Sequence, residues 1–323
     1  MNIHLAPMEG VIDHPMRALL TGVGGYTHCV TEFIRVVDRR LPARVFRRYC
    51  PELAHAGRTA VGTPVVVQLL GGIPEAMAEN AAMAASLGAP GIDINFGCPS
   101  RFVNRNAGGA VLLQEPERVY AITRAVRAAV PAHIPVSAKI RLGYDTTDLA
   151  LDNAHAVQNA GAGTITVHAR TKTDGYKHPA RWEWLARIKA QLTIPMIANG
   201  DINSVDDYHR CRAISGCDSV MLGRGALACP DLARQINAAQ RAEHVAAADW
   251  NQILELLIDY SHTLQQSDIH APGYVAARVK QWLIFLKGRY DEARACFHAV
   301  RAVKDSDEVV AQLRKVRRKT DMH

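Results

Sequence analysis

Residues 64–87 read PVVVQLLGGIPEAMAENAAMAASL, and this stretch contains the pattern that decides the fold. Its first part, Pro64 to Leu70, is rich in β-branched and apolar residues, which predicts a buried strand. Two glycines follow, and Pro74 to Leu87 then reads as an amphipathic helix. The stretch is one strand–helix unit.

The same unit recurs along the chain, with helical segments such as 116–130 and 150–160 between β-rich runs. Eight runs are predicted to be strands: Ile3 to Pro7, His28 to Phe33, Pro64 to Leu70, Gly91 to Asn95, Val136 to Arg141, Thr164 to Ala169, Pro195 to Asn199, and Ser219 to Gly223. Eight alternations favour a TIM (β/α)₈ barrel, because parallel neighbours need crossovers and eight units close the sheet without an edge. An open doubly wound sheet is the competing architecture. It would call for a glycine fingerprint after the first strand, whereas Ala6-Pro7-Met8-Glu9-Gly10 contains no G-x-G-x-x-G.

After Leu227 the alternation stops, and the remaining segments read as helices. We therefore expect residues 1–240 to form the barrel and residues 241–323 an all-helical domain. This domain ends in the basic stretch RKVRRK at 314–319. A nucleic-acid contact and a solvated helix end explain that stretch equally well.

Composition narrows the class of protein. The chain has 323 residues, of which 48% are hydrophobic and 21% charged, as in ordinary globular proteins. A net charge of +7 and a pI of about 9.1 favour polyanionic partners only modestly. Seven scattered cysteines without C-x-x-C spacing predict neither a disulfide framework nor a zinc site. The N-terminus lacks a signal peptide pattern, and no apolar run approaches eighteen residues, so we expect a cytoplasmic protein without a membrane anchor.

Polar residues gather where the predicted strands end, which is where barrel enzymes carry their reacting groups. Packing does not explain such a set, because buried cations and amides need partners. The residues at or just beyond strand ends are Gln68, Asn95, Cys98, Lys139, Arg141, His168, Arg170, Asn199, Asp201 and Arg224.

Two of these segments suggest specific roles. In DINFGCPS at 93–100, glycine and proline on either side of Cys98 shape a turn that would aim its thiol, although a lone cysteine is more often a small hydrophobe. Asn199-Gly200-Asp201 and Gly223-Arg224-Gly225 follow the last two strands, where barrels commonly bind phosphate. Tight turns are the alternative, and we favour a phosphate-bearing cofactor.

Residue type alone does not decide the roles of Lys139 and His168. Lys139 suits either a Schiff base or a fixed cation beside a reduced ring. His168 suits a general base, a hydrogen-bond donor to a cofactor, or a satisfied core histidine.

Taken together, these motifs resemble the tRNA-dihydrouridine synthases from Ala6 to about Leu286. The opening motif, Arg35 after Thr31-Glu32-Phe33, and the Val275 to Leu283 segment look most like the bacterial C subgroup, which reduces uridine 16 of the D loop. The motifs that carry the resemblance are APMEG (6–10), TEF (31–33), QLLG (68–71), NFGCP (95–99), KIRLG (139–143), HART (168–171), ANGDI (198–202) and GRGA (223–226).

The resemblance implies an FMN-dependent enzyme that reduces the 5,6 double bond of uridine, with NADPH or NADH as the electron source and Cys98 as the proton donor. It places FMN against Pro7, Met8, Glu9, Gln68, Lys139, His168, Asn199, Gly200, Asp201, Gly223 and Arg224. It assigns uracil or tRNA contacts to Arg35, Asn95, Tyr176, Tyr274, Arg278 and Lys280. It implies tRNA as the partner of a monomeric protein, and no metal.

Two departures from the family pattern stand near Cys98. Arg101 replaces the usual lysine three residues beyond the cysteine, and the following glycine-rich segment reads NAGGA at 106–110. Arginine keeps the charge but not the geometry, so the resemblance predicts the chemistry of this loop rather than the details of its RNA contacts.

Three rival functions remain at this stage. An FMN barrel oxidoreductase acting on a free pyrimidine, such as a dihydroorotate-type dehydrogenase, would share the barrel signals but not the basic helical extension. A Lys139 Schiff-base aldolase and a non-catalytic RNA-binding protein are the others.

Overall fold

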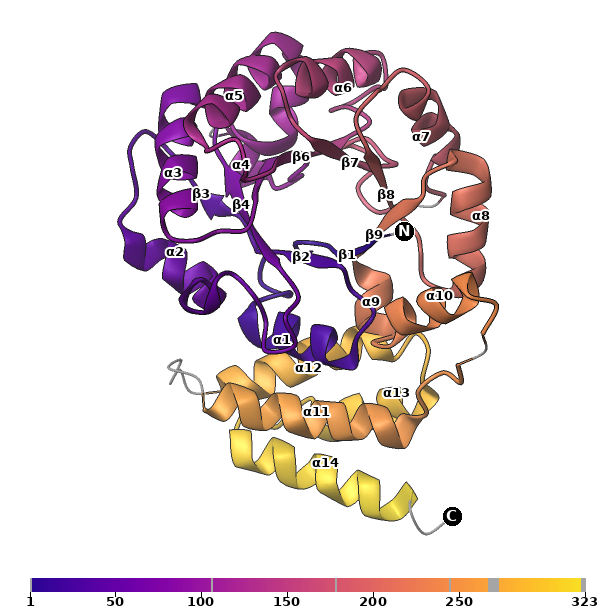
Figure 1. Cartoon of the computed structure of the whole chain (residues 1–323). Coiled ribbons are helices and arrows are strands. Elements are labelled where there is room, and N and C mark those ends of the chain that lie inside the picture. Colours follow the sequence, from indigo (N-terminus) through magenta and orange to yellow (C-terminus); the bar gives the residue numbers. More distant parts are fainter. Residues whose placement is uncertain (1, 106, 178, 244, 267–272, 321–323) are drawn as a thin grey trace. The chain divides into compact units, whose positions relative to one another are not determined.

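A computed structural model describes residues 2–105, 107–177, 179–243, 245–266 and 273–320, with side chains to residue 316. The chain forms two compact units. The first contains residues 1–14, 26–202 and 206–223, and the second contains residues 15–25, 203–205 and 224–323. Figure 1 shows both, coloured along the sequence.

The first unit is a closed parallel barrel, as predicted. Every strand pairing in the sheet is parallel, in the order β2-β1-β9-β8-β7-β6-β5-β4-β3, and a β2–β4 pairing closes the ring. The strands are β1 (Ile3–Leu5), β2 (His28–Val30), β3 (Ile34–Arg35), β4 (Val65–Leu70), β5 (Ile92–Phe96), β6 (Val136–Arg141), β7 (Thr164–His168), β8 (Met196–Asn199) and β9 (Ser219–Leu222).

The second predicted strand differs from the expectation, because β2 and β3 are two pieces of one barrel strand. Val30 pairs with Val66 and Ile34 with Leu69, so the β2–β3 strand advances four residues while β4 advances three. The extra residue makes a bulge. Within it the Thr31 hydroxyl accepts the backbone N–H of Gln68 at 3.0 Å, a bond that a regular ladder would give to a carbonyl.

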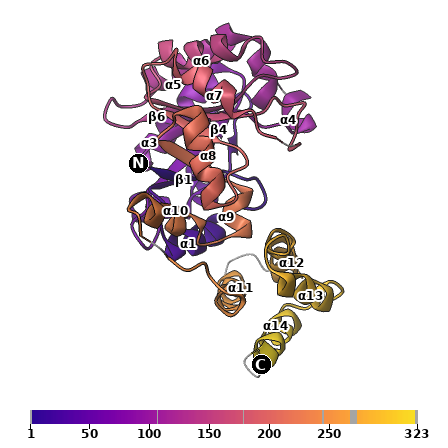
Figure 2. The ribbon, with the colours of Figure 1, turned by 90° about the vertical axis from the view of Figure 1, so that its right-hand side faces the viewer.

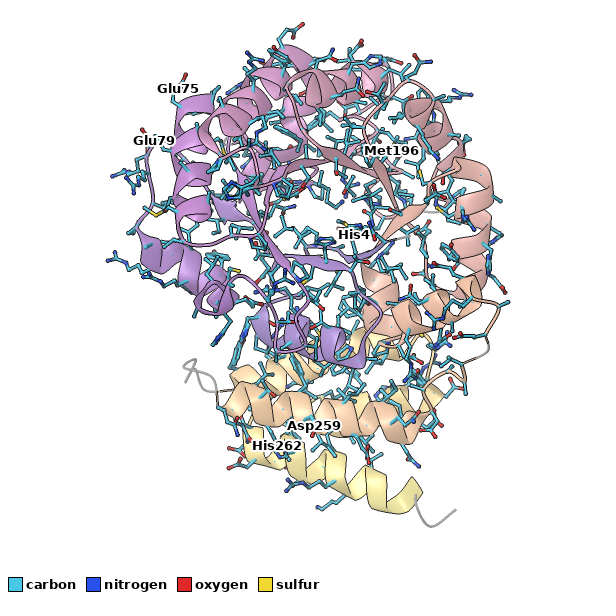
Figure 3. The ribbon with its side chains drawn as sticks, viewed as in Figure 1. His4, Glu75, Glu79, Met196, Asp259 and His262 are labelled. Carbon is cyan, nitrogen blue, oxygen red and sulfur yellow. The ribbon has the colours of Figure 1, made fainter. Side chains whose placement is uncertain are left out.

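Helices surround the ring of strands, and Figure 1 shows α3, α5, α6, α7 and α8 on its outside. Glu75 and Glu79 lie on the outer face of α3 and point away from the strands (Figure 3). The helices of this unit are α2 (Ala43–Tyr49), α3 (Pro74–Ser86), α4 (Arg101–Arg105), α5 (Pro116–Ala129), α6 (Ala150–Asn159), α7 (Trp182–Lys189) and α8 (Val205–Ser215), with 3-10 turns η1 (Pro51–His55) and η2 (Gly109–Gln114).

The second unit is built of helices. Trp282 lies at its core, donates from Nε1 to the Leu227 carbonyl at 3.0 Å, and meets the Tyr260 ring edge-on. Within this unit α11 packs against α12 and α14 (Figure 2). Its helices are most of α1 (His14–Val23), α9 (Arg224–Ala228), α10 (Leu232–Gln240), α11 (Trp250–Gln265), α12 (Tyr274–Leu286), α13 (Asp291–Val300) and α14 (Ser306–Thr320).

Because α9 and α10 group with the later helices, the second unit starts before Gln240 in this part of the chain. The division at 240 into a catalytic and an RNA-binding domain stays a prediction. Among the described helices, none has the length and apolar character that a membrane span requires.

Candidate active site

The interior of the barrel is polar at the carboxyl ends of its strands, and strand alternation explains why. In β6 (VSAKIR) the residues at 136, 138 and 140 are apolar, while Ser137, Lys139 and Arg141 alternate with them. Successive side chains of a strand point to opposite faces. Neighbouring strands in register continue the polar face: Asn95 lies beside Lys139, and His168 lies beside both Arg141 and Asn199.

A buried chain of hydrogen bonds crosses β4, β5 and β6, and Asp93 is its origin. Its carboxylate accepts from Gln68 Nε2 and from Ser137 Oγ, each at 2.6 Å. Gln68 Oε1 then accepts from Asn95 Nδ2 at 2.8 Å. Asn95 Oδ1 in turn accepts the backbone N–H groups of Gly97 at 3.0 Å and Cys98 at 2.9 Å. Each amide therefore has one orientation, and the turn that carries Cys98 is attached to the barrel interior.

Burial raises the pKa of the Asp93 carboxyl, and its hydrogen bonds to Gln68 and Ser137 and the charge of Lys139 oppose that rise. Lys139 is also buried, and its pKa is lowered to about 8. Burial is the largest cause, the neighbouring charge of Arg141 adds to it, and the charge of Asp93 opposes. Its Nζ donates to Asn199 Oδ1 at 3.0 Å, while Asn199 Nδ2 donates to the Met221 carbonyl at 2.8 Å. Burial and the neighbouring cation destabilise the ammonium form of Lys139, so a bound group with negative charge would stabilise it. This arrangement is typical of a site that receives negative charge.

Cys98 follows β5 on a short loop that leads into α4. Burial is the largest cause that raises the pKa of its thiol, and the charge of Glu9 adds to it; the backbone of Ser100 and the charges of Arg141 and Arg35 oppose. The thiol therefore keeps its proton at neutral pH. Nucleophilic cysteines need the opposite shift, so this environment suits a proton donor.

Buried Asn104 holds the Cys98 loop in shape. Its Nδ2 donates to the carbonyls of Cys98 at 3.1 Å and Ser100 at 2.6 Å, and its Oδ1 accepts the backbone N–H of Val111 at 2.7 Å. Gly109 has φ +67, and a side chain there would collide with the Cys98 carbonyl. The thiol is thus carried by a fixed turn.

His168 belongs to a second buried group at the ends of β7 and β8. Arg170 Nη1 lies 3.1 Å from His168 Nε2, and Arg170 Nη2 is paired with Asp201. A guanidinium can only donate, so Nε2 accepts and the ring proton sits on Nδ1. Gly200 has φ +126, and a Cβ there would come within 3.2 Å of the His168 ring.

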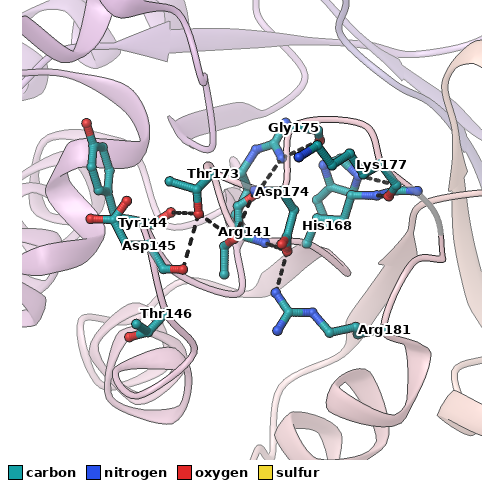
Figure 4. Close-up of polar contacts among 12 residues, drawn as sticks. Arg141, Tyr144, Asp145, Thr146, His168, Thr173, Asp174, Gly175, Lys177 and Arg181 are labelled. Atoms are coloured by element: carbon teal, nitrogen blue, oxygen red, sulfur yellow. Dashed lines mark hydrogen bonds and ion pairs between the residues drawn. The ribbon is translucent and has the colours of Figure 1, made fainter.

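The loop after β7 is fastened across the rim, as Figure 4 shows. Arg141 is the main link: its Nε donates to the Gly97 carbonyl at 2.7 Å, and its Nη1 donates to the carbonyls of Thr171 at 3.0 Å and Gly175 at 3.3 Å. The guanidinium carbon lies 5.7 Å from the centre of the Tyr176 ring, which is 52% exposed. Arg141 therefore joins the Cys98 turn to the loop that carries Tyr176.

The predicted N-terminal residues lie on the loop after β1. The Met8 carbonyl accepts the backbone N–H groups of Val11 at 3.0 Å and Ile12 at 2.9 Å. Pro7 is half-buried, and Glu9 is exposed. A Cβ on Gly223 would meet the Met8 sulfur at 3.7 Å, so the ends of β1 and β9 are neighbours. Arg224 begins α9, in the second unit.

The predicted tRNA contacts divide between the two units. Arg35, Asn95 and Tyr176 lie in the barrel, while Tyr274, Arg278 and Lys280 lie on α12 of the second unit. Arg278 is buried and donates to Gln281, and Lys280 donates to the carbonyls of Arg301 at 3.4 Å and Val303 at 2.7 Å, just after α13.

Sequence reasoning missed three residues that shape the site, namely Asp93, Ser137 and Asn104. A signal existed for two of them. Asp93 and Ser137 stand two positions before Asn95 and Lys139 in predicted strands, so they had to share the interior face with them. Asn104 carries no such signal, because its bonds depend on how the loop folds back.

The model of the dihydrouridine synthase (Dus) family matches residues 4–319. A tRNA-dihydrouridine(16) synthase of Pseudomonas syringae pv. tomato is 50% identical, over 97% of this chain and 98% of the relative. The enzyme of the same name from Escherichia coli O157:H7 is 47% identical, over 98% of each chain.

Among solved structures, an old yellow enzyme homologue from Zymomonas mobilis matches with a TM-score of 0.50 and 12% identity, over 78% of this chain and 91% of that one. A 2-naphthoyl-CoA reductase in complex with 2-naphthoyl-CoA matches with a TM-score of 0.55 and 14% identity, over 75% of this chain and 50% of that one. At such identities these likenesses concern the barrel fold alone.

Proposed function

The chain belongs to the dihydrouridine synthase family, and we propose that it reduces uridine 16 in the D loop of tRNA to 5,6-dihydrouridine. The observation that carries the proposal is the fixed Cys98 thiol beside a polar barrel mouth, in a chain half identical to synthases named for position 16. NADPH or NADH is the proposed electron source, and a monomeric, cytoplasmic protein is the accompanying prediction.

Cys98 acts in this proposal as a general acid. Reduction of the C5–C6 double bond adds a hydride to C6 and a proton to C5. The Cys98 thiol supplies the proton, and the thiolate that remains takes a proton from water, which the half-buried side chain can reach. Its raised pKa supports this role, because the thiol stays protonated until negative charge develops at C5 and the proton is transferred there.

The barrel mouth fits a flavin mononucleotide. When bound, that group supplies the hydride for C6 of uracil. Lys139 offers a buried cation for its polar edge, and Gln68 is held with its amide fixed by Asp93. The glycines at the ends of β8 and β9, Gly200 and Gly223, suit a phosphate bound by backbone N–H groups, with Arg224 next in the chain.

Asn95 and Tyr176 are the proposed uracil contacts. Asn95 uses Oδ1 for the Cys98 turn and one amide hydrogen for Gln68, which leaves the other amide hydrogen for a uracil oxygen. Tyr176 offers an exposed ring above the rim. A uridine reaches these groups only after extrusion from the folded RNA, and stacking on aromatic rings offsets part of that cost.

The helical second unit is proposed to grip the tRNA backbone through Tyr274, Arg278 and Lys280. Replacing both Arg278 and Lys280 by Met should weaken tRNA binding and reduce the slope of log K against log salt by up to about two. Binding measured at several salt concentrations tests this surface. Because Arg278 is buried and Lys280 donates to a carbonyl just after α13, thermal unfolding of the same variant must show that the unit still folds.

The proposed reaction is tested by mapping dihydrouridine on tRNA from cells that lack this protein, with and without its re-expression. Loss and recovery at position 16 is the expected result. An unchanged map, in a strain without a redundant enzyme, would contradict it and favour a free-pyrimidine reductase or a non-catalytic RNA-binding protein.

Cys98→Ala tests the proton donor separately. The variant should bind flavin and be reduced by NADPH as the wild type is, while dihydrouridine formation falls by about 10²- to 10⁴-fold. Undiminished product formation would remove Cys98 from the chemistry.

A further inference from the structure

An exposed aromatic ring stands beside the Cys98 loop. Phe102, the second residue of α4, is 65% exposed, although α4 lies at the rim where polar residues gather. Figure 2 shows α4 at one end of the barrel. A single exposed apolar residue needs no explanation by itself, so its surroundings decide what it does.

Arg35 stacks on this ring. Its guanidinium carbon lies 4.5 Å from the centre of the Phe102 ring and 5.9 Å from the centre of the Phe33 ring. Phe33 is buried and anchors the arrangement. We call Phe33, Arg35 and Phe102 the rim stack. An arginine beside exposed and buried aromatic rings is the kind of surface on which nucleobases stack, and it binds phosphate as well.

Contacts of Phe33 and of α4 link the rim stack to Cys98. Val103, next to Phe102, packs with Phe33 and Leu70 in one cluster, and Cys98 packs against the same cluster. Asn104 ties α4 to the carbonyls of Cys98 and Ser100. The helix that carries the exposed ring is therefore attached to the turn that carries the thiol, as a specific contact requires.

The segments that carry the rim stack have a net positive charge. Segments 32–40 and 101–105 contain five arginines and two carboxylates: Glu32, which accepts the backbone N–H of Gly10, and Asp38, which is paired with Arg39 at 3.2 Å. Arg101 and Arg105 on α4 are exposed on either side of Phe102. Aromatic and arginine side chains also occur at protein interfaces, but this excess of positive charge favours a polyanion.

We infer that the rim stack binds an unpaired base of the tRNA that neighbours the reduced uridine in the RNA chain, with Arg101 and Arg105 facing the flanking phosphates. This inference rests on the proposed function and adds a specificity site to it. Extruding one uridine removes a stacking partner from its neighbour, and a fixed aromatic ring replaces that partner.

The experiment combines protein variants with altered RNA. Phe102→Ala should raise the Kd for tRNA by about 5- to 150-fold, the range for losing one base–aromatic contact. Phe102→Trp should restore binding, whereas Phe102→Leu, which is apolar but lacks a π face, should not. Ile214→Ala on α8, where Ile214 is 48% exposed, is the matched control and should bind as the wild type does. Flavin reduction by NADPH without tRNA should be the same in every variant.

A second arm removes the base instead of the ring. Substrate tRNAs carry an abasic residue immediately before or after the target uridine. One of the two should weaken wild-type binding as much as Phe102→Ala does, and should weaken the Phe102→Ala variant no further. Additive losses for both tRNAs, or wild-type affinity of Phe102→Ala, would overturn the inference. If the wild type forms no dihydrouridine in any tRNA, the proposed function itself fails, which is a different result.

Discussion

His4 offers a prediction whose size follows from the structure. It lies within the ring of strands (Figure 3), and its imidazole stacks on that of His28 with centroids 5.3 Å apart and planes 10° from parallel. The pKa of His4 is lowered from 6.5 to about 4, mainly by burial and in addition by the neighbouring His28. Burial and the charge of Arg58 lower the pKa of His28 as well. Both rings are therefore held neutral in the folded protein.

The sign of the effect on stability follows from this depressed pKa. As pH falls, the unfolded chain takes up a proton on His4 near pH 6.5, whereas the folded protein resists until about pH 4. The contribution of His4 is fully present above pH 6.5 and is lost as the pH falls towards 4. A difference of about 2.5 units corresponds to about 3.4 kcal/mol, of which about 2 kcal/mol is lost between pH 7.5 and 5.

His4→Phe tests this value, because phenylalanine keeps a ring of similar size without titrating. The free energy of unfolding is measured by urea titration at pH 7.5 and 5. The variant should lose about 2 kcal/mol less stability than the wild type over this interval. The exposed residue His133, changed to Phe, is the control and should follow the wild type. Equal losses in wild type and His4→Phe would refute the reasoning.

Three further substitutions test individual contacts. Asp93→Leu removes the acceptor that orients Gln68, so kcat/KM for dihydrouridine formation should fall at least about tenfold. Asp93→Asn should recover part of this loss, and wild-type activity of the Leu variant would count against the role of Asp93. Arg141→Lys loses the bonds that join the Cys98 turn to the Tyr176 loop, so kcat should fall about tenfold. The flavin spectrum should not change, and an altered spectrum would point to a displaced cofactor instead. Lys280→Met leaves carbonyls after α13 without their cation, so urea titration should show a loss of about 1 kcal/mol, and none if the contact is immaterial.

The barrel could be predicted from the sequence because its signal is repeated. Each strand run is short and apolar, each is followed by a helix pattern, and an error in one unit does not change the count of the others. The second strand shows where this fails. His28 to Phe33 reads as one continuous run. In the structure, however, the Thr31 hydroxyl accepts the backbone N–H of Gln68, and regular pairing with β4 resumes only at Ile34. A side chain that replaces a backbone partner leaves no trace in the pattern of apolar residues.

Lys280 shows a different limit. Lys280 is predicted to contact tRNA, and in the structure its ammonium also reaches carbonyls 21 and 23 residues further along the chain, a contact that the sequence does not indicate. Whether a cation faces solvent or a neighbouring helix end depends on how two helices pack, and helix periodicity does not specify that packing. Cations on strands are easier to place, because Lys139 and Asn95 both stand at predicted strand ends and the register of the neighbouring strands then puts them side by side.

The amides of the site need one more step than register, namely the direction in which each hydrogen bond runs. Gln68 and Asn95 could each face either way, and their positions alone do not decide which atom meets the substrate. Asp93 decides it, because a carboxylate facing a hydroxyl and an amide accepts from both. Gln68 must then offer its oxygen to Asn95, and Asn95 must offer its own oxygen to the Cys98 turn. A buried carboxylate two residues inside the strand end thus determines that the barrel presents an amide hydrogen, rather than an oxygen, beside the thiol.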